Sequence, residues 1–575
     1  MQYLVLATIF ILIGFLARSS IRPLYLFGGT LAFFYFTGLI GTESLLQNFV
    51  NEGLVTLVLL LLISTVLENT IFIRQNSSAL FSKNRYRFSL LKVSSVTSFF
   101  SAFLNNTAMV AIMMSVIRRQ KGIVSSKFLL PLSYAAILGG TVTLIGTSTN
   151  LIVNSFVIGE GMPPLGMFDF APIGIVLVLG GLVYMLLFSK KLLPEIKTDE
   201  SEDQRSFFIE AKINTESSLI GKSVKENGFR NMRELFLAEI VRNDRLISPV
   251  TPSEIIEEGD ILVFAGNIHD IEELKSFDGL SIFEEKSRVL GSNLVEAIVS
   301  HKSILIGQKI KEAGFRSKFN AAVVAVRRGS KPLRGKIGLI RIEAGDQMIL
   351  SVGQDFKNRD NLENNFYLIS NINQNRFLSV RDSIIAITLF VSAILVSALG
   401  FVSLFKSMLM VMMVYIALKW TRLRQLRHHL PFELIVVIGS ALGIAEVLIS
   451  SGAAAILVDF ITMLFHDMGN YGYLVAIYLL TLILTEMVTN NAAAALMFPI
   501  AYTTAQSHGI DTMPFIMAVA YGASASFITP YSYQTNLMVY SAGRYRFSDY
   551  VRYGVPMSIV YSTIVLIMLP IVFPM

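Results

Sequence analysis

The sequence predicts a polytopic α-helical membrane protein with a soluble insert between two membrane halves, and three observations lead to this fold class. The 575 residues are 53% hydrophobic and only 15% charged, and their mean hydropathy is +0.60. Apolar runs long enough to cross a hydrocarbon core of ~30 Å recur along the chain. Residues 194–375, in contrast, are polar and alternate short β-type runs with polar helical ones.

The composition excludes several classes of function. The chain has no cysteine, so it has no disulfide, no thiolate metal site and no cysteine nucleophile. Its net charge of +7 comes from basic residues that lie mostly at the ends of apolar runs. This placement indicates membrane orientation and not nucleic-acid binding. No Ser–His–Asp arrangement, phosphate loop or metal cluster is visible, so we predict that the protein is not an enzyme and uses no organic cofactor.

The two membrane halves repeat one order of elements, with five spans, a short helix and a re-entrant hairpin in each. We predict transmembrane repeat 1 at residues 1–193 with its hairpin at 89–118, and transmembrane repeat 2 at 380–575 with its hairpin at 473–506. The short helices are expected at 75–88 and 453–466. The expected spans are 2–17, 21–40, 53–70, 126–158 and 170–190 in the first repeat, and 383–400, 402–418, 431–450, 515–543 and 555–573 in the second. The first span has no basic segment or cleavage site around it, so we expect it to be retained.

The distribution of Lys and Arg predicts the orientation of the repeats. Basic loops such as 118–127 and 419–427 are assigned to the cytoplasm, and loops nearly free of Lys and Arg, such as 159–169 and 506–514, to the outside. This assignment requires five crossings per half, which inverts the second repeat relative to the first. We therefore expect a multi-pass protein of the plasma (inner) membrane, with both termini outside and the insert in the cytoplasm.

The insert contains a repeat of its own. LIGKSVKENGFR at 219–230 matches LIGQKIKEAGFR at 305–316, an offset of 86 residues, and EEGDILVFAG at 257–266 matches EAGDQMILSVG at 343–353. Self-similarity at a fixed spacing is typical of tandem copies of one supersecondary unit. We predict two small α+β domains, at 204–284 and 289–372.

Each hairpin carries polar side chains at its tip, inside an otherwise apolar run. The tips read Ser101-x-x-x-Asn105-Asn106-Thr107 and Thr485-x-x-x-Thr489-Asn490-Asn491. Buried amides are costly in a bilayer core unless they have a partner or a ligand. A second polar segment, GTSTN at 146–150 or ITPYSYQTN at 528–536, then interrupts a later span of each half. Two tips and two breaks at matched positions predict the midplane site of a secondary transporter, with oxygen atoms for Na⁺ and helix N-termini for an anion.

These residues resemble those of the divalent anion–sodium symporters, the family of dicarboxylate, citrate and sulfate carriers, whose hairpin tips carry Ser-Asn-Thr. Asn105-Asn106-Thr107 and Thr489-Asn490-Asn491 stand at the tips, and Gly146-Thr147 and Thr529-Pro530 at the breaks. Residues 524–556 look especially like the sulfate-transporting branch that carries cytoplasmic domains. The LIG and EGD repeats are similar to the TrkA-C (RCK C-terminal) module of potassium-conductance regulators. No GxGxxG turn accompanies them, so NAD binding is not implied.

The resemblance implies a mechanism and a set of site residues. It implies the ion-transporter superfamily fold, an elevator mechanism, a homodimer in the bilayer, sodium as coupling ion and cytoplasmic modules that regulate transport, some of which bind small ligands in other proteins. One sodium ion would be held by Ser101, Asn105, Asn106 and Gly146, and a second by Thr485, Val488, Asn490 and Ile528, with Val488 and Ile528 contributing backbone carbonyls. The anion would lie between Asn106, Thr107, Thr147, Thr489, Asn490, Asn491, Thr529 and Pro530.

Departures from the family pattern bear on the substrate. Asn105 and Asn491 replace smaller residues of the family, and a narrower cavity favours a compact oxyanion such as sulfate. A sodium/dicarboxylate symporter stays as an alternative. So do an ion channel gated by the cytoplasmic modules, which would lack a TVGYG-like filter, and an antiporter of the same superfamily, which would need titratable residues at the tips.

Three carboxylates in or near the spans are further candidates for function. Glu68 and Glu446 occupy equivalent positions in the two repeats, which favours a shared structural role such as tying helix ends to the hairpins. Glu486 is adjacent to Thr485, so it either touches a cation site or orients the hairpin.

Overall fold

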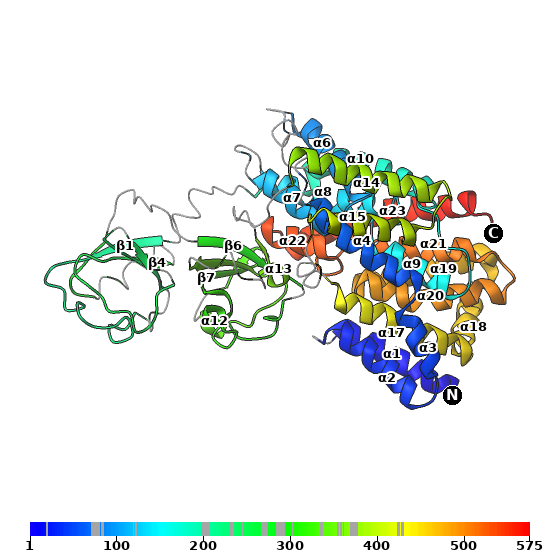
Figure 1. The fold of residues 1–575 in the computed structure, drawn as a ribbon, viewed down its shortest axis with the longest axis horizontal. Helices are drawn as coiled ribbons and strands as arrows, with labels where there is room; N and C mark the ends of the chain where they lie inside the picture. Colours follow the sequence, from blue (N-terminus) through cyan, green and yellow to red (C-terminus); the bar gives the residue numbers. More distant parts are fainter. Residues whose placement is uncertain are drawn as a thin grey trace.

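A computed structural model of the chain shows a helical part and a β-rich part that projects from one end of it (Figure 1). The helical part is formed by residues 1–196 and 378–575, and the β-rich part lies within 208–368. The described residues are 1–18, 21–68, 70, 81, 85–118, 120, 124–196, 208–229, 232, 235–243, 245–247, 249–265, 274, 277–282, 294–301, 303–333, 337–353, 356, 359, 362–368, 378–421, 426 and 430–575.

The helical part contains two series of helices, one from each half of the chain. The first contains α1 (Gln2–Arg18), α2 (Pro23–Phe36), α3 (Thr42–Phe49), α4 (Glu52–Glu68), α6 (Tyr86–Ser101), α7 (Asn106–Arg118), η2 (Ser125–Lys127), α8 (Leu129–Gly140), α9 (Ser148–Gly159) and α10 (Ala171–Leu192). The second contains α14 (Val380–Ala398), α15 (Leu404–Ala417), α17 (Phe432–Ser450), α18 (Ala453–Phe465), η6 (His466–Met468), α19 (Gly469–Met487), α20 (Asn490–Ser507), α21 (Thr512–Ser524), α22 (Gln534–Ala542) and α23 (Phe547–Val572). The predicted short helix at 75–88 lies mostly outside the described residues.

Several of these helices are long and apolar enough to cross a membrane. The described residues contain six such stretches, of which Thr42–Leu67 and Phe547–Val572 are the longest at 26 residues each. Shorter apolar helices, including α1, α2, α15 and α21, accompany them. Local sequence explains where some helices begin: Ser379 and Ser403 accept the backbone N–H of Asp382 and Lys406 and so cap α14 and α15.

The regions predicted as spans 126–158 and 515–543 each consist of two helices with a break between them. The helices end at Gly140 and Ser524 and resume at Ser148 and Gln534. The breaks therefore begin earlier than the predicted segments 146–150 and 528–536. Thr147 and Tyr533 are the extended residues that end each break and precede the next helix. The polar residues after them form the first turns of α9 and α22.

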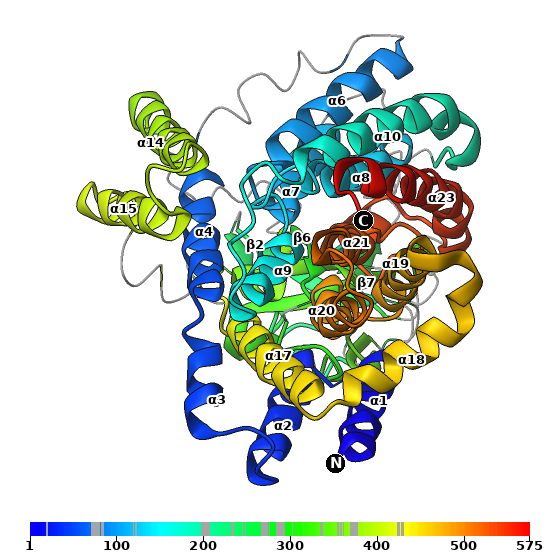
Figure 2. The same ribbon diagram turned by 90° about the vertical axis from the view of Figure 1, so that its right-hand side faces the viewer.

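The outer helices of each half pack against the other half. α2 packs on α17 and α15 packs on α4, so the outer helices of each half contact the third long helix of the other. In Figure 2, α14 and α15 lie beside α4, and α9, α20 and α21 lie near the centre of the view. Each hairpin packs on the first half of a broken helix, α6 on α8 and α19 on α21. This packing brings the hairpin tips and the breaks to the middle of the helical part.

The insert contains two five-stranded antiparallel sheets with one strand order. The first is β3-β2-β4-β1-β5 and the second, read from its other edge, is β8-β7-β9-β6-β10. The strands are β1 (Phe208–Ile213), β2 (Phe236–Arg242), β3 (Arg245–Ile247), β4 (Ile261–Ala265), β5 (Leu280–Ile282), β6 (Leu294–Val299), β7 (Ala321–Arg328), β8 (Lys331–Pro332), β9 (Gln347–Val352) and β10 (Phe366–Leu368). Short helices α12 (Phe315–Phe319) and α13 (Leu362–Asn365) belong to the second domain.

The two sheets agree in side-chain detail as well. Each encloses a hydrophobic core of its own. In the first, the guanidinium of Arg242 donates to both carboxylate oxygens of Asp260 at 2.8 and 2.9 Å. In the second, Arg328 donates to Asp346 at 2.7 and 2.8 Å. Both aspartates are fully buried, and the hydrogen bonds to them raise the pKa of both arginines.

Candidate functional site

The tip of the first hairpin joins the end of α6 to the start of α7 through polar side chains. The hydroxyl of Ser101 donates to Oδ1 of Asn106 at 2.5 Å, and both residues are buried. Asn105 lies in the turn, where its Oδ1 accepts the backbone N–H of Thr107 at 2.9 Å and caps α7. Gly140 at the end of α8 lies against Asn106, because a Cβ there would be 2.7 Å from Nδ2. The hairpin tip is thus packed directly on the start of the first break.

The tip of the second hairpin repeats this arrangement and adds more oxygen atoms. The Oγ1 of Thr485 lies 3.0 Å from Oδ1 of Asn490 and 2.7 Å from the carbonyl oxygen of Ala523. The hydroxyl of Ser526, in the second break, donates to Oδ1 of Asn490 at 2.6 Å. Two hydroxyl oxygens, an amide oxygen and a backbone carbonyl oxygen therefore gather in one buried place. Oxygen ligands of this kind suit a hard cation such as Na⁺.

The two breaks are braced by equivalent asparagines. Nδ2 of Asn150 donates to the carbonyl of Thr143 at 2.9 Å, and Nδ2 of Asn536 donates to the carbonyl of Ser526 at 2.8 Å. The hydroxyl of Thr143 in turn donates to the carbonyl of Ala102 at the first tip. The asparagine follows its partner by 7 residues in the first break and by 10 in the second. Between the helices, the first break spans residues 141–147 and the second spans 525–533, so the second break is two residues longer.

The starts of α7, α9, α20 and α22 meet through hydrogen bonds that cross between the halves. Thr107, the second residue of α7, donates its hydroxyl hydrogen to Oε1 of Gln534, the first residue of α22, at 3.1 Å. Ser148, the first residue of α9, donates to Oδ1 of Asn491, the second residue of α20, at 3.1 Å. In each contact one half supplies the residue at the tip and the other half supplies the residue at the break. The two contacts are equivalent under the internal repeat.

Tyr533 links these contacts to the first tip. Nδ2 of Asn106 donates to the hydroxyl oxygen of Tyr533 at 2.8 Å, and the same hydroxyl interacts with Thr147. Four helix N-termini therefore converge, and each carries a partial positive charge of roughly +0.5 from its macrodipole. None of the described residues that make these contacts is a lysine or an arginine. Helix N-termini favour a negative charge without a fixed positive charge, and this suits reversible binding of an anion.

Glu486 shapes the second break and does not reach into the oxygen cluster of the second tip. Its Oε1 accepts the backbone N–H groups of Phe527 and Ile528 at 2.9 and 2.8 Å, and its Oε2 accepts that of Thr529 at 3.0 Å. Three consecutive N–H groups freed by the break are satisfied by one carboxylate. Of the two predicted roles for Glu486, the contacts favour orientation of the hairpin against the break.

Most residues of the predicted sites lie at the tips and breaks, but they differ in their contacts. The structure brings together Ser101 with Asn106, Thr485 with Asn490, and Thr107, Thr147 and Asn491 with residues of the opposite half. Gly146 lies against Gly140, since a Cβ on Gly146 would be 2.5 Å from the carbonyl oxygen of Gly140. The others have local contacts: Asn105 and Thr489 cap helices, Val488 ends α19, Ile528 and Thr529 donate to Glu486, and Pro530 is buried.

Sequence reasoning missed four residues of this arrangement: Ser148, Ser526, Tyr533 and Gln534. All four lie in or beside the polar segments that mark the breaks. The hydroxyl groups of Ser148 and Ser526 could have marked these two residues as candidates from the sequence. Tyr533 and Gln534 could not be assigned, because the two extra residues of the second break shift its alignment with the first.

Glu446 bonds to a helix that is not part of either hairpin. Its Oε2 accepts a hydrogen bond from Nδ2 of Asn48 in α3 at 3.1 Å, and its side chain is exposed. The expectation that it ties a helix end to a hairpin is therefore wrong, because α3, unforeseen in the sequence, takes up this carboxylate. Glu68 is the last residue of α4.

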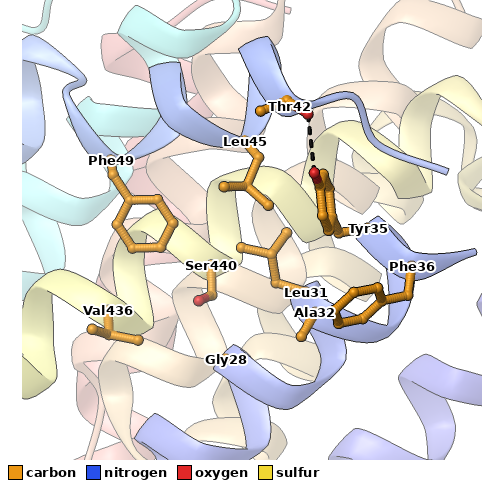
Figure 3. A pocket seen from close by; sticks show the side chains of 10 residues that line it. All are labelled: Gly28, Leu31, Ala32, Tyr35, Phe36, Thr42, Leu45, Phe49, Val436 and Ser440. Atoms are coloured by element: carbon orange, nitrogen blue, oxygen red, sulfur yellow. Dashed lines mark hydrogen bonds between the residues drawn. The ribbon is translucent and has the colours of Figure 1, made fainter. Parts of the chain in front are cut away.

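A separate cavity of about 490 Å³ lies between α2, α3 and α17 (Figure 3). Its lining is mostly apolar, including Leu31, Leu45 and Phe49. Tyr35 and Thr42 share a hydrogen bond of 3.1 Å at its edge. A lining of this kind does not suit a divalent anion, so the polar tips and breaks are the better candidate.

The chain matches known transporter sequences over most of its length. A family model described as citrate transporter matches residues 9–520. An uncharacterized transporter of Synechocystis is 30% identical over 91% of this chain and 89% of its own length. Sodium/sulfate cotransporters 1 and 2 of Chlamydomonas reinhardtii are each 28% identical, over 62% of this chain and 42% of their own length.

Proposed function

Because the chain belongs to the citrate transporter family, we propose that it is a sodium-coupled symporter that imports a divalent anion, and that this anion is sulfate. The protein is a multi-pass membrane protein that transports anions, and it is not an enzyme. The single observation that carries the proposal is the meeting of four helix N-termini through contacts that cross between the halves.

This meeting point supports a divalent anion as the substrate. Hydroxyl and amide groups of Thr107, Ser148, Asn491 and Gln534 bond to one another across the space. An anion that enters would exchange these modest contacts for hydrogen bonds to a charged group, which are about twice as strong. The helix dipoles would favour its negative charge. An elongated dicarboxylate would need more room than these direct contacts leave, so a compact tetrahedral oxyanion fits best.

The two hairpin tips support sodium as the coupling ion. Ser101 with Asn106, and Thr485 with Asn490 and Ser526, place buried oxygen atoms within 2.5 to 3.0 Å of each other. A sodium ion at each tip would replace these hydrogen bonds as the partner of the same oxygens and would fix Asn106 and Asn490, the first residues of α7 and α20. Sodium binding would thereby orient the helix starts that receive the anion. Coupling follows because the anion meets an ordered site only when sodium is bound.

The packing supports an elevator mechanism, and the proposal also includes a homodimer in the plasma membrane. α1, α2 and α17 on one side, and α14, α15 and α4 on the other, form an outer layer whose contacts cross between the halves. The hairpins and broken helices would move as a unit against this layer. The insert would lie in the cytoplasm, where its TrkA-C-like domains, at 204–284 and 289–372, would regulate the movement, and both termini would lie outside.

Uptake of radiolabelled sulfate into proteoliposomes tests the proposal. With an inward sodium gradient, uptake should saturate and exceed uptake in potassium medium by at least about tenfold. Unlabelled citrate and succinate provide the comparison, because the family model is described as a citrate transporter. Strong competition by either acid with weak sulfate uptake would favour the alternative of a sodium/dicarboxylate symporter. Unsaturable uptake that ignores the gradient would contradict a symporter and favour a channel.

A further inference from the structure

The second β domain contacts α7 and α22, two of the helices whose first residues meet at the proposed anion site. Nη2 of Arg118, the last residue of α7, donates to Oε1 and Oε2 of Glu296 in β6 at 3.1 and 3.0 Å. Nε2 of Gln347 in β9 also donates to Glu296. In α22, the hydroxyl of Ser541 donates to the carbonyl oxygen of Gly345. Figure 1 shows the second domain beside α22, between the helical part and the first domain.

Glycines allow this domain to approach α22 closely. A Cβ on Gly345 would lie 2.6 Å from Cδ1 of Leu537, and a Cβ on Gly329 would lie 2.7 Å from the hydroxyl oxygen of Tyr540. Both distances are too short for real contacts, so a side chain at either position would push the domain away from the helix. The contact is therefore a fitted surface made of an ion pair, a hydrogen bond and two close backbone approaches.

The same domain also touches the outer layer of helices. Nη2 of Arg22, which immediately precedes α2, donates to the carbonyl oxygen of Ser303 at 3.0 Å. The second domain thus bridges α2 on one side and the α7–α22 pair on the other. Relative movement of these helices has to break or reorient one of the two attachments.

The first domain offers a natural comparison, because each docking residue has an equivalent 86 positions earlier. Gly259 is equivalent to Gly345 and faces open space, with no atom within 4 Å of a Cβ. Asn243 is equivalent to Gly329. The first domain therefore has a side chain at the position where the second domain has a glycine. Two domains of one strand order therefore differ at the surface that meets α22.

We propose that the second β domain restrains the helices that form the anion site. It does so by bridging α2 to the cytoplasmic ends of α7 and α22. This inference rests on the proposed function. α7 is a single helix with Asn106 at one end and Arg118 at the other, about 18 Å apart at 1.5 Å per residue. α22 connects Gln534 in the site to Ser541 at the domain. Docking at one end of each helix is transmitted along a rigid element to the other end, where Thr107 bonds to Gln534.

A matched pair of glycine variants tests the restraint. Gly345→Ala and Gly259→Ala both place alanine at a left-handed φ, +82° and +78°. The backbone strain should therefore be similar in the two variants. Only Gly345→Ala collides with Leu537. We expect the initial rate of sodium-driven sulfate uptake to rise about fivefold or more in Gly345→Ala relative to Gly259→Ala, with the order of anion preference unchanged.

A second pair removes the ion pair without steric strain. Glu296→Gln weakens the hold on Arg118, and Glu210→Gln changes the equivalent strand position of the first domain. Uptake should rise in Glu296→Gln and not in Glu210→Gln. Exchanging the charges, with Arg118→Glu and Glu296→Arg in one protein, should bring the rate back toward the wild-type value.

Hydrogen–deuterium exchange of the purified full-length variants reports docking independently of transport. Peptides covering 534–545 should exchange faster in Gly345→Ala and Glu296→Gln than in their controls. Unchanged exchange in both variants would overturn the docking contact. Faster exchange with control-like or reduced uptake would overturn the restraint. Wild-type protein that takes up neither sulfate nor citrate would overturn both the proposed function and the restraint that rests on it. Transport by the wild type, with the same uptake rate in Gly345→Ala and Gly259→Ala, would overturn the restraint alone.

Discussion

Thr107 and Gln534 are separated by 427 residues, yet the hydroxyl of Thr107 donates to Oε1 of Gln534 at 3.1 Å. Ser148 and Asn491 form the equivalent contact, also at 3.1 Å. In each pair one residue comes from a hairpin tip of one half and the other from the broken helix of the opposite half. The site is therefore shared between the halves in two symmetric parts, and neither half can form it alone. This explains why the polar residues occur as matched sets in the sequence.

Two substitutions of Gln534 should distinguish the loss of a hydrogen bond from the addition of a negative charge at this site. Gln534→Ala removes one neutral hydrogen bond, worth about 0.5–1.5 kcal/mol, so the KM for sulfate should rise roughly 2- to 12-fold. Gln534→Glu places a carboxylate at the meeting of four helix N-termini and should abolish uptake by repelling the anion. Thr107→Ser keeps the hydroxyl donor and is the control, with uptake near that of the wild type. Wild-type uptake by Gln534→Glu would remove α22 from the anion site.

Sodium dependence should depend on the oxygen cluster of the second tip. Thr485→Val and Ser526→Ala each remove one of the buried oxygens around Asn490. We expect the sodium concentration for half-maximal uptake to rise at least about fivefold in each, while the sulfate preference is kept. Thr481→Val is the matched control, because this buried threonine lies one turn earlier in α19 and its hydroxyl donates to the carbonyl of Ile477 within the same helix. An equal sodium shift in all three variants would place the effect in α19 packing and not in a cation site.

The sequence predicted the elements of this site better than their connections. Polar residues in apolar runs are costly, so hydropathy alone marked both tips and both breaks, and the repeat paired Ser101 with Thr485 and Asn106 with Asn490. The bonds of Thr107 to Gln534 and of Asn106 to Tyr533 could not be predicted, since they join positions 427 residues apart and depend on the packing of α7 against α22. The helix α3 was also missed, because residues 41–52 are too polar and too short to be expected as part of a span.

Gly140 should be essential for the geometry of the first tip. An alanine Cβ there would lie 2.7 Å from Nδ2 and 3.0 Å from Oδ1 of Asn106. It would displace the amide from both Ser101 and Tyr533. Leaving such buried groups unpaired costs about 1–3 kcal/mol, so uptake at low sodium should fall roughly 5- to 150-fold. Gly29→Ala in α2 is the control, because no atom lies within 4 Å of its Cβ, and its uptake should be unchanged. Normal uptake by Gly140→Ala would show that the tip tolerates a displaced Asn106.

The buried arginine–aspartate pairs of the two β domains provide a final comparison. Arg242→Ala leaves the fully buried Asp260 without its guanidinium, and Arg328→Ala does the same to Asp346. Breaking a buried pair from one side costs about 3–5 kcal/mol, so each variant should unfold its own domain at a lower temperature. Differential scanning calorimetry of the full-length protein should show this shift in both variants. Only Arg328→Ala should also raise the rate of sulfate uptake, because in the described part of the chain it is the second domain that docks on α7 and α22, through Glu296 and Gly345. An equal change in uptake from Arg242→Ala would show that both domains act on transport, and would contradict a restraint that resides in the second.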